Sequence, residues 1–354
     1  MDTEKVYYPG LDALRGIAII LVVLYHYFPF FRIGWIGVDL FFVLSGFLIT
    51  GILLKTRNET SYFRDFFVRR ALRIFPVYFL VLIAFYICCP LLFVQKQAGS
   101  AYSYYIDNQI WFWTITENWL FIKEGVPPEP YLQHLWSLAI EEQFYLIWPV
   151  LLYSLRSLVI IKYFLLALFL IALSLRVVLW FYYTGYEAFY YNTFARLDSF
   201  AAGAFLSILH LQKKRISKAQ INVVFFAFLA LLFCAIFISK NLDHNSVPFA
   251  TVGYSIAALF FMCICFKLIN SNAIIARSSL LKQIGRISYG VYVYHIPVFL
   301  VGNFVLHKMI SVNDTGSVAQ VIPFICIGVT FLISFLSYKI VELPCLRFRD
   351  KLMQ

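Results

Sequence analysis

Charged residues are scarce in this sequence: Asp, Glu, Lys and Arg together account for 13% of its 354 residues. Soluble domains carry about 25% charged residues, so this composition excludes a chain that is mostly surrounded by water. The sequence also has no extended polar stretch between its apolar runs, which argues against a soluble appendage. We therefore expect residues 1–354 to form one membrane domain.

The sequence also lacks the spacings of a metal centre. Its 7 cysteines form no C-x-x-C pair and no Cys/His ligand spacing, so we expect no metal and interpret most of them as small packing residues. They are Cys88, Cys89, Cys234, Cys263, Cys265, Cys326 and Cys345. No repeat of fixed period and no similarity between the two halves is visible, which argues against an inverted-repeat transporter.

Apolar residues, in contrast, are abundant: they make up 62% of the chain and include 38 Phe and 24 Tyr. A helix needs roughly 17–25 mostly apolar residues to cross the hydrocarbon core of a bilayer. Runs of that length recur along the chain and predict an all-α, polytopic fold of about ten transmembrane helices. We place them at residues 11–31, 36–55, 74–94, 134–155, 160–182, 191–211, 221–239, 247–269, 287–308 and 318–341.

The basic residues orient these helices. With a cytoplasmic N-terminus, most of the 29 lysines and arginines fall in cytoplasmic loops, and the opposite loops hold only Arg32, Lys96, Lys123, Lys240 and Lys308. The positive-inside rule therefore predicts that both termini are cytoplasmic. This bias also explains the net charge of +11 without a nucleic-acid partner. Residues 110–122 are apolar but short, which favours an interfacial or re-entrant segment; if they spanned, all later helices would invert.

Two ionisable residues lie in the first apolar run, where each is costly unless paired or hydrated. Arg15 and His26 are 11 residues apart, so they share one stripe of an α-helix. The orientation puts Arg15 near the cytoplasmic boundary and His26 in the outer half, and the stripe could line a path across the membrane. Alternatively, Arg15 is a snorkelling boundary residue and His26 a satisfied core histidine.

A cluster of arginines follows the second apolar run, at Arg64, Arg69, Arg70 and Arg73 in a cytoplasmic loop that leads into the third. The spacing of Arg70 and Arg73 puts two guanidinium groups on one helical face. Arginine forks bind phosphate in bidentate fashion, so we expect an anion site here. The alternative is that the arginines serve only the topology of the chain.

The topology brings further polar groups to one outer membrane level. They are Asp39, His134, Ser137, Glu141, Arg196 and Asp198. His134, Ser137 and Glu141 are spaced to share one helical face. A histidine in an acyl-transfer site needs a carboxylate to fix its tautomer, and Asp39 and Glu141 are the candidates. Alternatively, the carboxylates pair with Arg196 or Arg32 at helix ends.

Two more polar residues lie in or beside later spans. His295 precedes Pro297 by two residues in an otherwise apolar helix, and Glu342 lies at the cytoplasmic end of the last span. Glu342 could pair there with the arginine cluster. We interpret both as residues that line the reaction path, with a purely structural role as the alternative for each.

Taken together, these segments resemble the acyltransferase-3 family of bacterial membrane O-acyltransferases. The resemblance runs from end to end through GLDALRGIAIILVVLYH with its Arg-x10-His signature, GVDLFFVLSGFLIT, the pair Arg70 and Arg73, HLWSLAIEEQFYLIWP, ARLDSFAAGAF, GRISYGVYVYHIP and VELP. One position departs from the family pattern: Leu343 stands in the VELP segment where a basic residue is common.

The resemblance implies a fold, a donor and an acceptor. It implies a multi-pass enzyme of the bacterial cytoplasmic membrane with acyl-CoA, above all acetyl-CoA, as its cytoplasmic co-substrate and no resident cofactor. The acceptor is the hydroxyl of a carbohydrate or lipid-linked glycan on the outer face, and the other partner is membrane lipid. Because the chain stops at Gln354, we expect no fused hydrolase-like domain of the kind that some members carry.

These roles combine into one mechanistic hypothesis. Arg70 and Arg73, with Arg15, hold the CoA phosphates, and the pantetheine arm follows the stripe to His26. His26 acts either as general base toward the acceptor hydroxyl or as nucleophile toward the thioester, and Asp39 or Glu141 orients it. Ser137, Arg196, Asp198, His295 and Glu342 line the path.

Two other classes of function remain as alternatives. A secondary transporter or flippase of a glycan or anionic metabolite would also carry intramembrane charges, but it would not need CoA. A membrane scaffold would leave the alignment of Arg15 with His26 without a reason.

Overall fold

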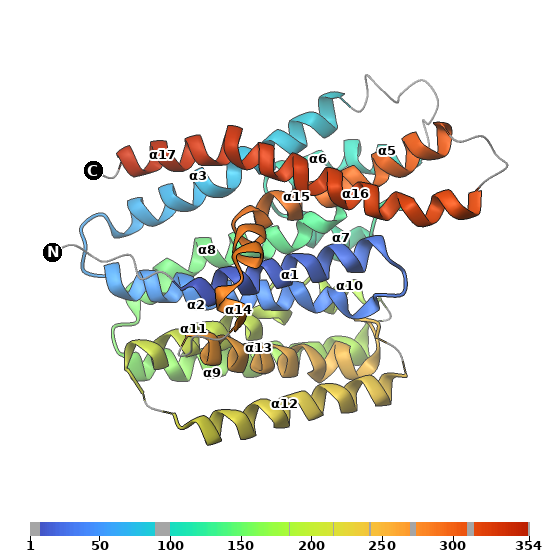
Figure 1. Cartoon of the computed structure of the whole chain (residues 1–354). Coiled ribbons are helices and arrows are strands. Elements are labelled where there is room, and N and C mark those ends of the chain that lie inside the picture. The colour runs from blue at the N-terminus through green and yellow to red at the C-terminus, as the bar shows by residue number, and fades with distance from the viewer. Residues whose placement is uncertain are drawn as a thin grey trace.

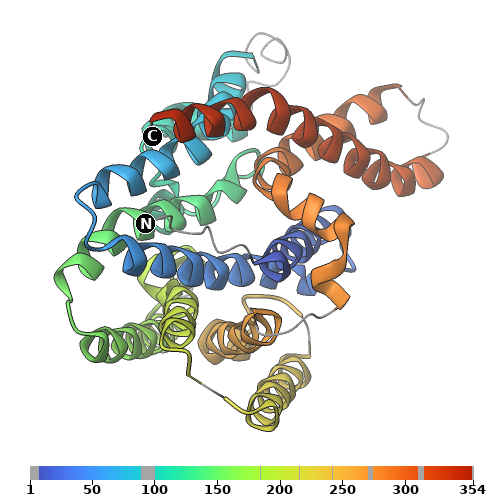
Figure 2. The same ribbon diagram turned by 60° about the vertical axis from the view of Figure 1, so that its left-hand side comes forward.

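The computed structural model describes residues 8–88, 100–183, 185–214, 216–240, 242–269, 274–309 and 315–352. Its long helices lie side by side in Figure 1, and the turned view of Figure 2 shows them as one bundle. They are α1 Pro9–Tyr27, α2 Ile36–Thr56, α3 Tyr62–Ile83, α8 Trp136–Ser154, α9 Leu158–Tyr182, α11 Leu197–Leu211, α12 Lys218–Ser239, α13 Tyr254–Ile269, α15 Ser279–Met309, α16 Thr315–Ser337 and α17 Leu343–Leu352.

The prediction of an all-α polytopic membrane protein is confirmed. Within the described ranges, nine helical stretches are long and apolar enough to cross a membrane. They match nine of the ten predicted spans. The remaining one corresponds to α8, which has 19 residues but carries the acidic pair Glu141 and Glu142 and runs along the same bundle in Figure 1. The first turn of α1 and the last turn of α17 lie at the same end of the bundle, as the even number of spans predicts.

Residues 110–122 do not span. They belong to two short helices, α6 (Gln109–Trp113) and α7 (Glu117–Glu124), which follow α5 (Ser100–Asp107) beside the outer ends of the long helices. Glu117 in α7 is fully buried, and its burial holds the pKa of this carboxyl well above its usual range. Glu117 accepts a hydrogen bond from the hydroxyl of Tyr78 at 3.3 Å, which ties this segment to α3.

The third span begins earlier than expected. We predicted a loop up to residue 73, whereas α3 begins at Tyr62 and carries all four arginines of the cluster on its first turns. The charged residues in those turns lower the local hydropathy, so a hydropathy window places the boundary too late. The arginines are therefore fixed on a helix, and Arg70 and Arg73 project from one face of it.

Small residues set the central helix pairs. α1 packs most extensively against α15, and α2 against α11. A Cβ atom added to Gly203 of α11 would overlap the carbonyl oxygen of Val43 in α2, and one added to Gly46 would overlap that of Phe200. Small residues let membrane helices approach closely without a hydrophobic driving force between them. These contacts fix α2 beside α11 and hold the polar residues of both helices in register.

Candidate active site

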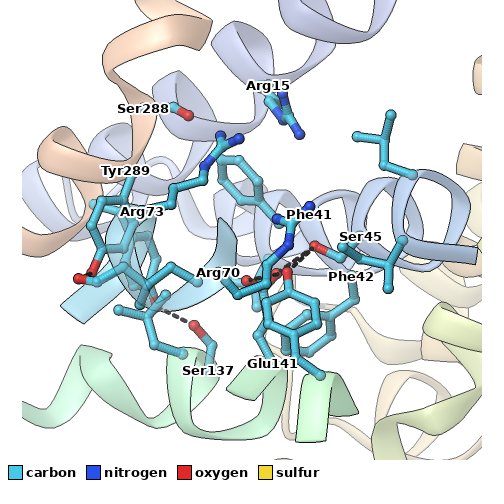
Figure 3. Close-up of a pocket in the computed structure, with 17 residues that line it drawn as sticks. Arg15, Phe41, Phe42, Ser45, Arg70, Arg73, Ser137, Glu141, Ser288 and Tyr289 are labelled. Atoms are coloured by element: carbon cyan, nitrogen blue, oxygen red, sulfur yellow. Dashed lines mark hydrogen bonds between the residues drawn. The ribbon is translucent and has the colours of Figure 1, made fainter. Parts of the chain in front are cut away.

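An inner cavity of about 80 Å³ lies among α1, α2, α3, α8 and α15. We define it by its polar lining residues Arg15, Ser45, Arg70, Arg73, Glu141 and Tyr292. Figure 3 shows the guanidinium groups of Arg15, Arg70 and Arg73 pointing into one space from two helices. Such a convergence of cations can bind a polyanion, because each fork offers several N–H donors in a fixed plane.

The arginines of the inner cavity have donors to spare. Arg15 forms an ion pair with Asp12 at 3.1 Å. Arg70 lies over the rings of Phe66 and Tyr145, and its buried Nε has no hydrogen-bond partner in the described part of the chain. For Arg73, the described residues provide no ion pair and no side-chain hydrogen bond. The guanidinium groups of the inner cavity therefore have N–H donors that can form hydrogen bonds to a ligand.

Glu141 belongs to this inner cavity. We expected it at the level of Asp39, but a helix rises 1.5 Å per residue, and seven residues after His134 carry Glu141 about 10 Å deeper. Its carboxylate accepts hydrogen bonds from the hydroxyls of Ser45 at 2.9 Å and Tyr145 at 3.1 Å. Glu141 therefore contributes a hydrogen-bonded carboxylate to the lining of the inner cavity, which the three arginines also line.

Tyr292 separates the inner cavity from a middle pocket of about 30 Å³ and lines both. Its hydroxyl donates to the carbonyl oxygen of His134 at 2.6 Å and lies 2.5 Å from the hydroxyl of Ser137. We define the middle pocket by Val38, Tyr292, His26 and His134, and Val38 also lines the inner cavity. The side chains of Tyr292 and Val38 thus border both spaces.

An outer cavity of about 210 Å³ continues from the middle pocket, and the two share His26, His134 and three aromatic residues. We define the outer cavity by His26, His134, Trp136, Tyr190, Tyr191 and His244. His244 lies in the loop before α13, and burial, together with nearby Arg196 and His26, lowers its pKa to about 4. His244 is therefore a neutral imidazole at neutral pH.

His26 lies where the middle pocket and the outer cavity meet. Its Nδ1 is 2.9 Å from the carbonyl oxygen of Val22 and 3.3 Å from Nε2 of His295. A carbonyl oxygen can only accept, so Nδ1 carries the proton and Nε2 of the neutral ring is a bare acceptor. The side chain is thus in the tautomer that a general base or a nucleophile needs.

His295 is buried directly behind His26. The ring centres of His26 and His295 are 4.9 Å apart, and Nδ1 of His295 is 2.5 Å from the carbonyl oxygen of Tyr292. The same tautomer argument leaves its Nε2 as an acceptor for the Nδ1–H group of His26. His295 therefore contacts the candidate base itself and does not line either neighbouring cavity.

The structure places Asp39 and Glu141 away from the imidazole. In the described residues no hydrogen bond connects either carboxylate to His26. Asp39 instead forms a buried ion pair with Arg196 at 2.8 Å and accepts a hydrogen bond from Ser199 at 3.2 Å. The tautomer of His26 is held by the carbonyl group of Val22, and this replaces the orienting carboxylate that we expected.

Arg196 and Asp198 form a frame behind the outer cavity and do not line it. The Arg196 guanidinium lies 4.0 Å from the ring centre of Tyr254 and 5.5 Å from that of Tyr190. Asp198 pairs with Arg176 at 2.6 Å, and both side chains are fully buried. We call Trp136 and Tyr190 the aromatic wall of the outer cavity, and these ion pairs support it from behind.

Glu342 lies on the π-helical turn η6 (Tyr338–Glu342) between α16 and α17. We expected it to pair with the arginine cluster, yet among the described residues it forms no ion pair, and its buried Oε1 has no hydrogen-bond partner. Arg73 is the cation that acts on it electrostatically. Its contribution to the path stays a prediction.

Several site residues escaped the sequence analysis. Tyr145, Tyr292 and His244 hold or line the cavities, but among 24 tyrosines and 6 histidines no local pattern distinguishes them. Arg176 was given no role in the sequence analysis, and only the fold brings Asp198 to it. A search of the described residues finds no cluster of His, Cys, Asp and Glu that could hold a metal ion.

Comparison with known proteins agrees with this geometry. Residues 8–339 match the family model described as an acyltransferase domain, which covers nearly the whole chain. The chain belongs to the acyltransferase-3 family. Five of the segments that carry the resemblance supply lining residues of the three cavities, through Arg15 and His26, Val38, Arg70 and Arg73, His134 and Glu141, and Tyr292, whereas ARLDSFAAGAF and VELP supply none. No solved structure matches the chain.

Curated members of the family match along almost the full chain. The O-acetyltransferase OatA of Staphylococcus aureus is 31% identical over 360 residues, which cover 96% of this chain and 57% of the relative. The peptidoglycan O-acetyltransferase OatA of Listeria monocytogenes is 31% identical over 368 residues, covering 96% and 56%. The putative peptidoglycan O-acetyltransferase YrhL of Bacillus subtilis is 31% identical over 362 residues, covering 96% and 55%. This chain thus spans little more than half the length of these relatives.

Proposed function

We propose that this protein transfers an acyl group, most simply acetyl, from acyl-CoA at the inner cavity to a hydroxyl group in the outer cavity. The observation that carries the proposal is the place of His26. A bare imidazole nitrogen lies between a space lined by three arginines and a space lined by aromatic rings and neutral polar groups. A polyanionic donor and a neutral acceptor can then meet at one base.

The donor side follows from charge. CoA carries phosphate groups at one end and the thioester at the end of a long flexible arm. Arg15, Arg70 and Arg73 can neutralise the phosphates through charge-assisted hydrogen bonds. The arm would pass Tyr292 to bring the thioester carbonyl carbon to His26. Most of the lysines and arginines lie in loops that we predict to be cytoplasmic. The positive-inside rule therefore favours the cytoplasmic face of the cytoplasmic membrane for this donor end.

The chemical step can follow two routes with the same products. In the first, Nε2 of His26 takes the proton of the acceptor hydroxyl while its oxygen attacks the thioester carbon. The C–S bond breaks, and the CoA thiolate leaves with the proton from His26. In the second, Nε2 attacks the thioester carbon first, the C–S bond breaks and the CoA thiolate departs. The acceptor oxygen then attacks the acyl carbon, the C–N bond to Nε2 breaks, and the hydroxyl proton passes to the CoA thiolate. In both routes His295 accepts from Nδ1–H of His26 and stabilises its positive charge.

The acceptor that we propose is a hydroxyl of a cell-envelope carbohydrate. Two of the relatives are named peptidoglycan O-acetyltransferases, one of them as putative, so peptidoglycan is the first acceptor to test. An acyl group added outside the membrane from a donor inside would need the string of three cavities that crosses the bundle. A glycan transporter would also use such a path, but it would leave CoA unused.

The test uses the purified protein in lipid nanodiscs with radiolabelled acetyl-CoA and soluble peptidoglycan fragments. We expect labelled glycan from the wild type, and a loss of at least about 10²-fold with His26→Gln, because a general base contributes 10²–10⁴-fold. His210→Gln is the matched control, since His210 contacts Tyr8 and lies outside the three cavities. Glycan translocation without any acetyl transfer, or equal rates in both variants, would overturn the proposal.

A further inference from the structure

The outer cavity differs chemically from the inner one. Its lining contains histidines, tyrosines, a tryptophan and a glutamine, and in the part of the chain that the structure describes no Asp, Glu, Lys or Arg side chain lines it. A charged ligand would lose its hydration there without an opposite charge in return. The cavity therefore suits a neutral ligand with polar groups.

His134 specifies what kind of polar group. It is 4% exposed, and its Nε2 lies 3.1 Å from the carbonyl oxygen of Val293. That oxygen can only accept, so Nε2 carries the proton of the neutral ring. Nδ1 is then a bare acceptor, and it is buried without a hydrogen-bond partner among the described residues. Burial of an unsatisfied acceptor is costly, so a ligand that fills this position must donate a hydrogen.

His26 offers a second acceptor to the same cavity. Its Nδ1–H points to the carbonyl oxygen of Val22, so its Nε2 can accept a hydrogen bond from a donor. Both rings flank His295, with ring centres 4.9 Å from it for His26 and 5.0 Å for His134. Both rings also line the outer cavity. One ligand the size of a sugar ring in this cavity would therefore contact both imidazoles.

We propose that the outer cavity recognises a neutral sugar ring through two of its hydroxyl groups. One hydroxyl donates to Nε2 of His26 and is acylated. A second hydroxyl of the same ring donates to Nδ1 of His134 and is not acylated. This contact selects the ring and determines which of its positions reacts. This assignment rests on the proposed function and deepens it, because it makes His134 the residue that determines acceptor specificity.

The aromatic wall fits the rest of such a ring. Trp136 and Tyr190 line the cavity with ring centres 4.7 Å apart, and the His244 ring lies 4.3 Å from Tyr190. The C–H face of a sugar can pack on these faces, while the buried Nε2 of His244 has no partner among the described residues and offers a further polar contact. The wall contributes affinity, and His134 contributes the choice of position.

The test compares methyl glucopyranoside with its monodeoxy derivatives as acceptors of labelled acetyl-CoA in nanodiscs. In the wild type, removal of the hydroxyl that binds His134 should lower kcat/KM by about tenfold or more without removing the acetylated position. His134→Leu removes the acceptor nitrogen, so this deoxy sugar and the parent should react alike. His134→Asn places an amide oxygen where Nδ1 lies and should restore the preference.

The outcomes separate the two proposals. An unchanged deoxy profile in His134→Leu would overturn the specificity assignment and leave the proposed function intact. Inactivity of both folded His134 variants, judged by unchanged thermal unfolding, would also overturn it, because a second hydroxyl contact is not needed for the reaction itself. Transfer to charged glycans with none to neutral sugars would contradict the neutral-ring site. No transfer by the wild type to any acceptor would overturn the proposed function together with this inference.

Discussion

At the scale of single residues, the role of a polar side chain follows from whether it is buried and whether its buried atoms have hydrogen-bond partners. Arg70 has a buried Nε without a partner, whereas Arg64 on the same helix is exposed to the surroundings. Both are arginines of one predicted cluster, yet only one of them lines the inner cavity. A cation with unfilled donors inside a cavity indicates a ligand site, and an exposed cation on the same helix serves topology.

The arginine site yields a first prediction. Arg70→Ala and Arg73→Ala should each weaken CoA binding by about 1–3 kcal/mol, because each removes a charge-assisted contact to phosphate. Isothermal titration of CoA into the nanodisc-embedded protein measures this loss. Arg64→Ala is the control and should bind CoA like the wild type. A comparable loss in all three variants would show that only the overall positive charge matters.

The buried pair of Asp39 and Arg196 gives a second prediction. Asp39→Asn should destabilise the protein by about 3–5 kcal/mol, because it leaves the Arg196 guanidinium buried without its counter-charge. Asp243→Asn removes the exposed partner of Arg32 and should cost at most about 1 kcal/mol. Thermal unfolding of both variants in the same detergent compares them. Equal stability of the two would contradict the structural role that we assign to Asp39.

At the scale of elements, helix spacing depends on glycine where two backbones meet. Gly203→Ala should lower the stability by about 1–3 kcal/mol, because its Cβ would overlap the Val43 carbonyl oxygen and push α11 from α2. Gly328→Ala in α16 is the control: among the described residues, no atom outside its own helical backbone and chain neighbours lies within 4 Å of its added Cβ, so helix propensity alone favours alanine there. Unfolding temperatures test this pair of variants. A Gly203→Ala protein as stable as Gly328→Ala would mean that the helices do not cross so closely.

Among the elements, the long helices could be predicted from the sequence. The bilayer fixes the length of a span, and a run of apolar residues of that length is visible in a local stretch of the chain. The start of α3 was predicted about twelve residues too late, since charged residues on its first turns hide a helix from a hydropathy pattern. The spacing of Arg70 and Arg73 could be interpreted correctly as one helical face because helical periodicity is local.

The partners of buried charges could not be predicted in this way. Asp198 pairs with Arg176 and Asp39 with Arg196, and each pair joins residues from different helices. Their pairing is set by how the helices pack, and no local periodicity records it. The carbonyl groups of Val22 and Val293, which fix the tautomers of two histidines, carry no sequence signal at all, because every residue has a carbonyl group.

At the scale of the whole molecule, three cavities form one sequence across the bundle. The inner cavity holds the cations, the middle pocket lies beyond Tyr292 and Val38, and the outer cavity is neutral and aromatic. His26 lies at the junction of the last two and is the base that we propose. The charge difference between the two ends is the basis on which we propose that the donor binds on one side of the membrane and the acceptor on the other.

The most direct test of this account measures transfer across a sealed membrane. Proteoliposomes with labelled acetyl-CoA on one side and a soluble glycan acceptor on the other report where the product forms. We predict labelled glycan on the side opposite the donor for the wild type and His210→Gln, and none for His26→Gln. Product that forms only on the donor side, or equal product from His26→Gln, would contradict the account.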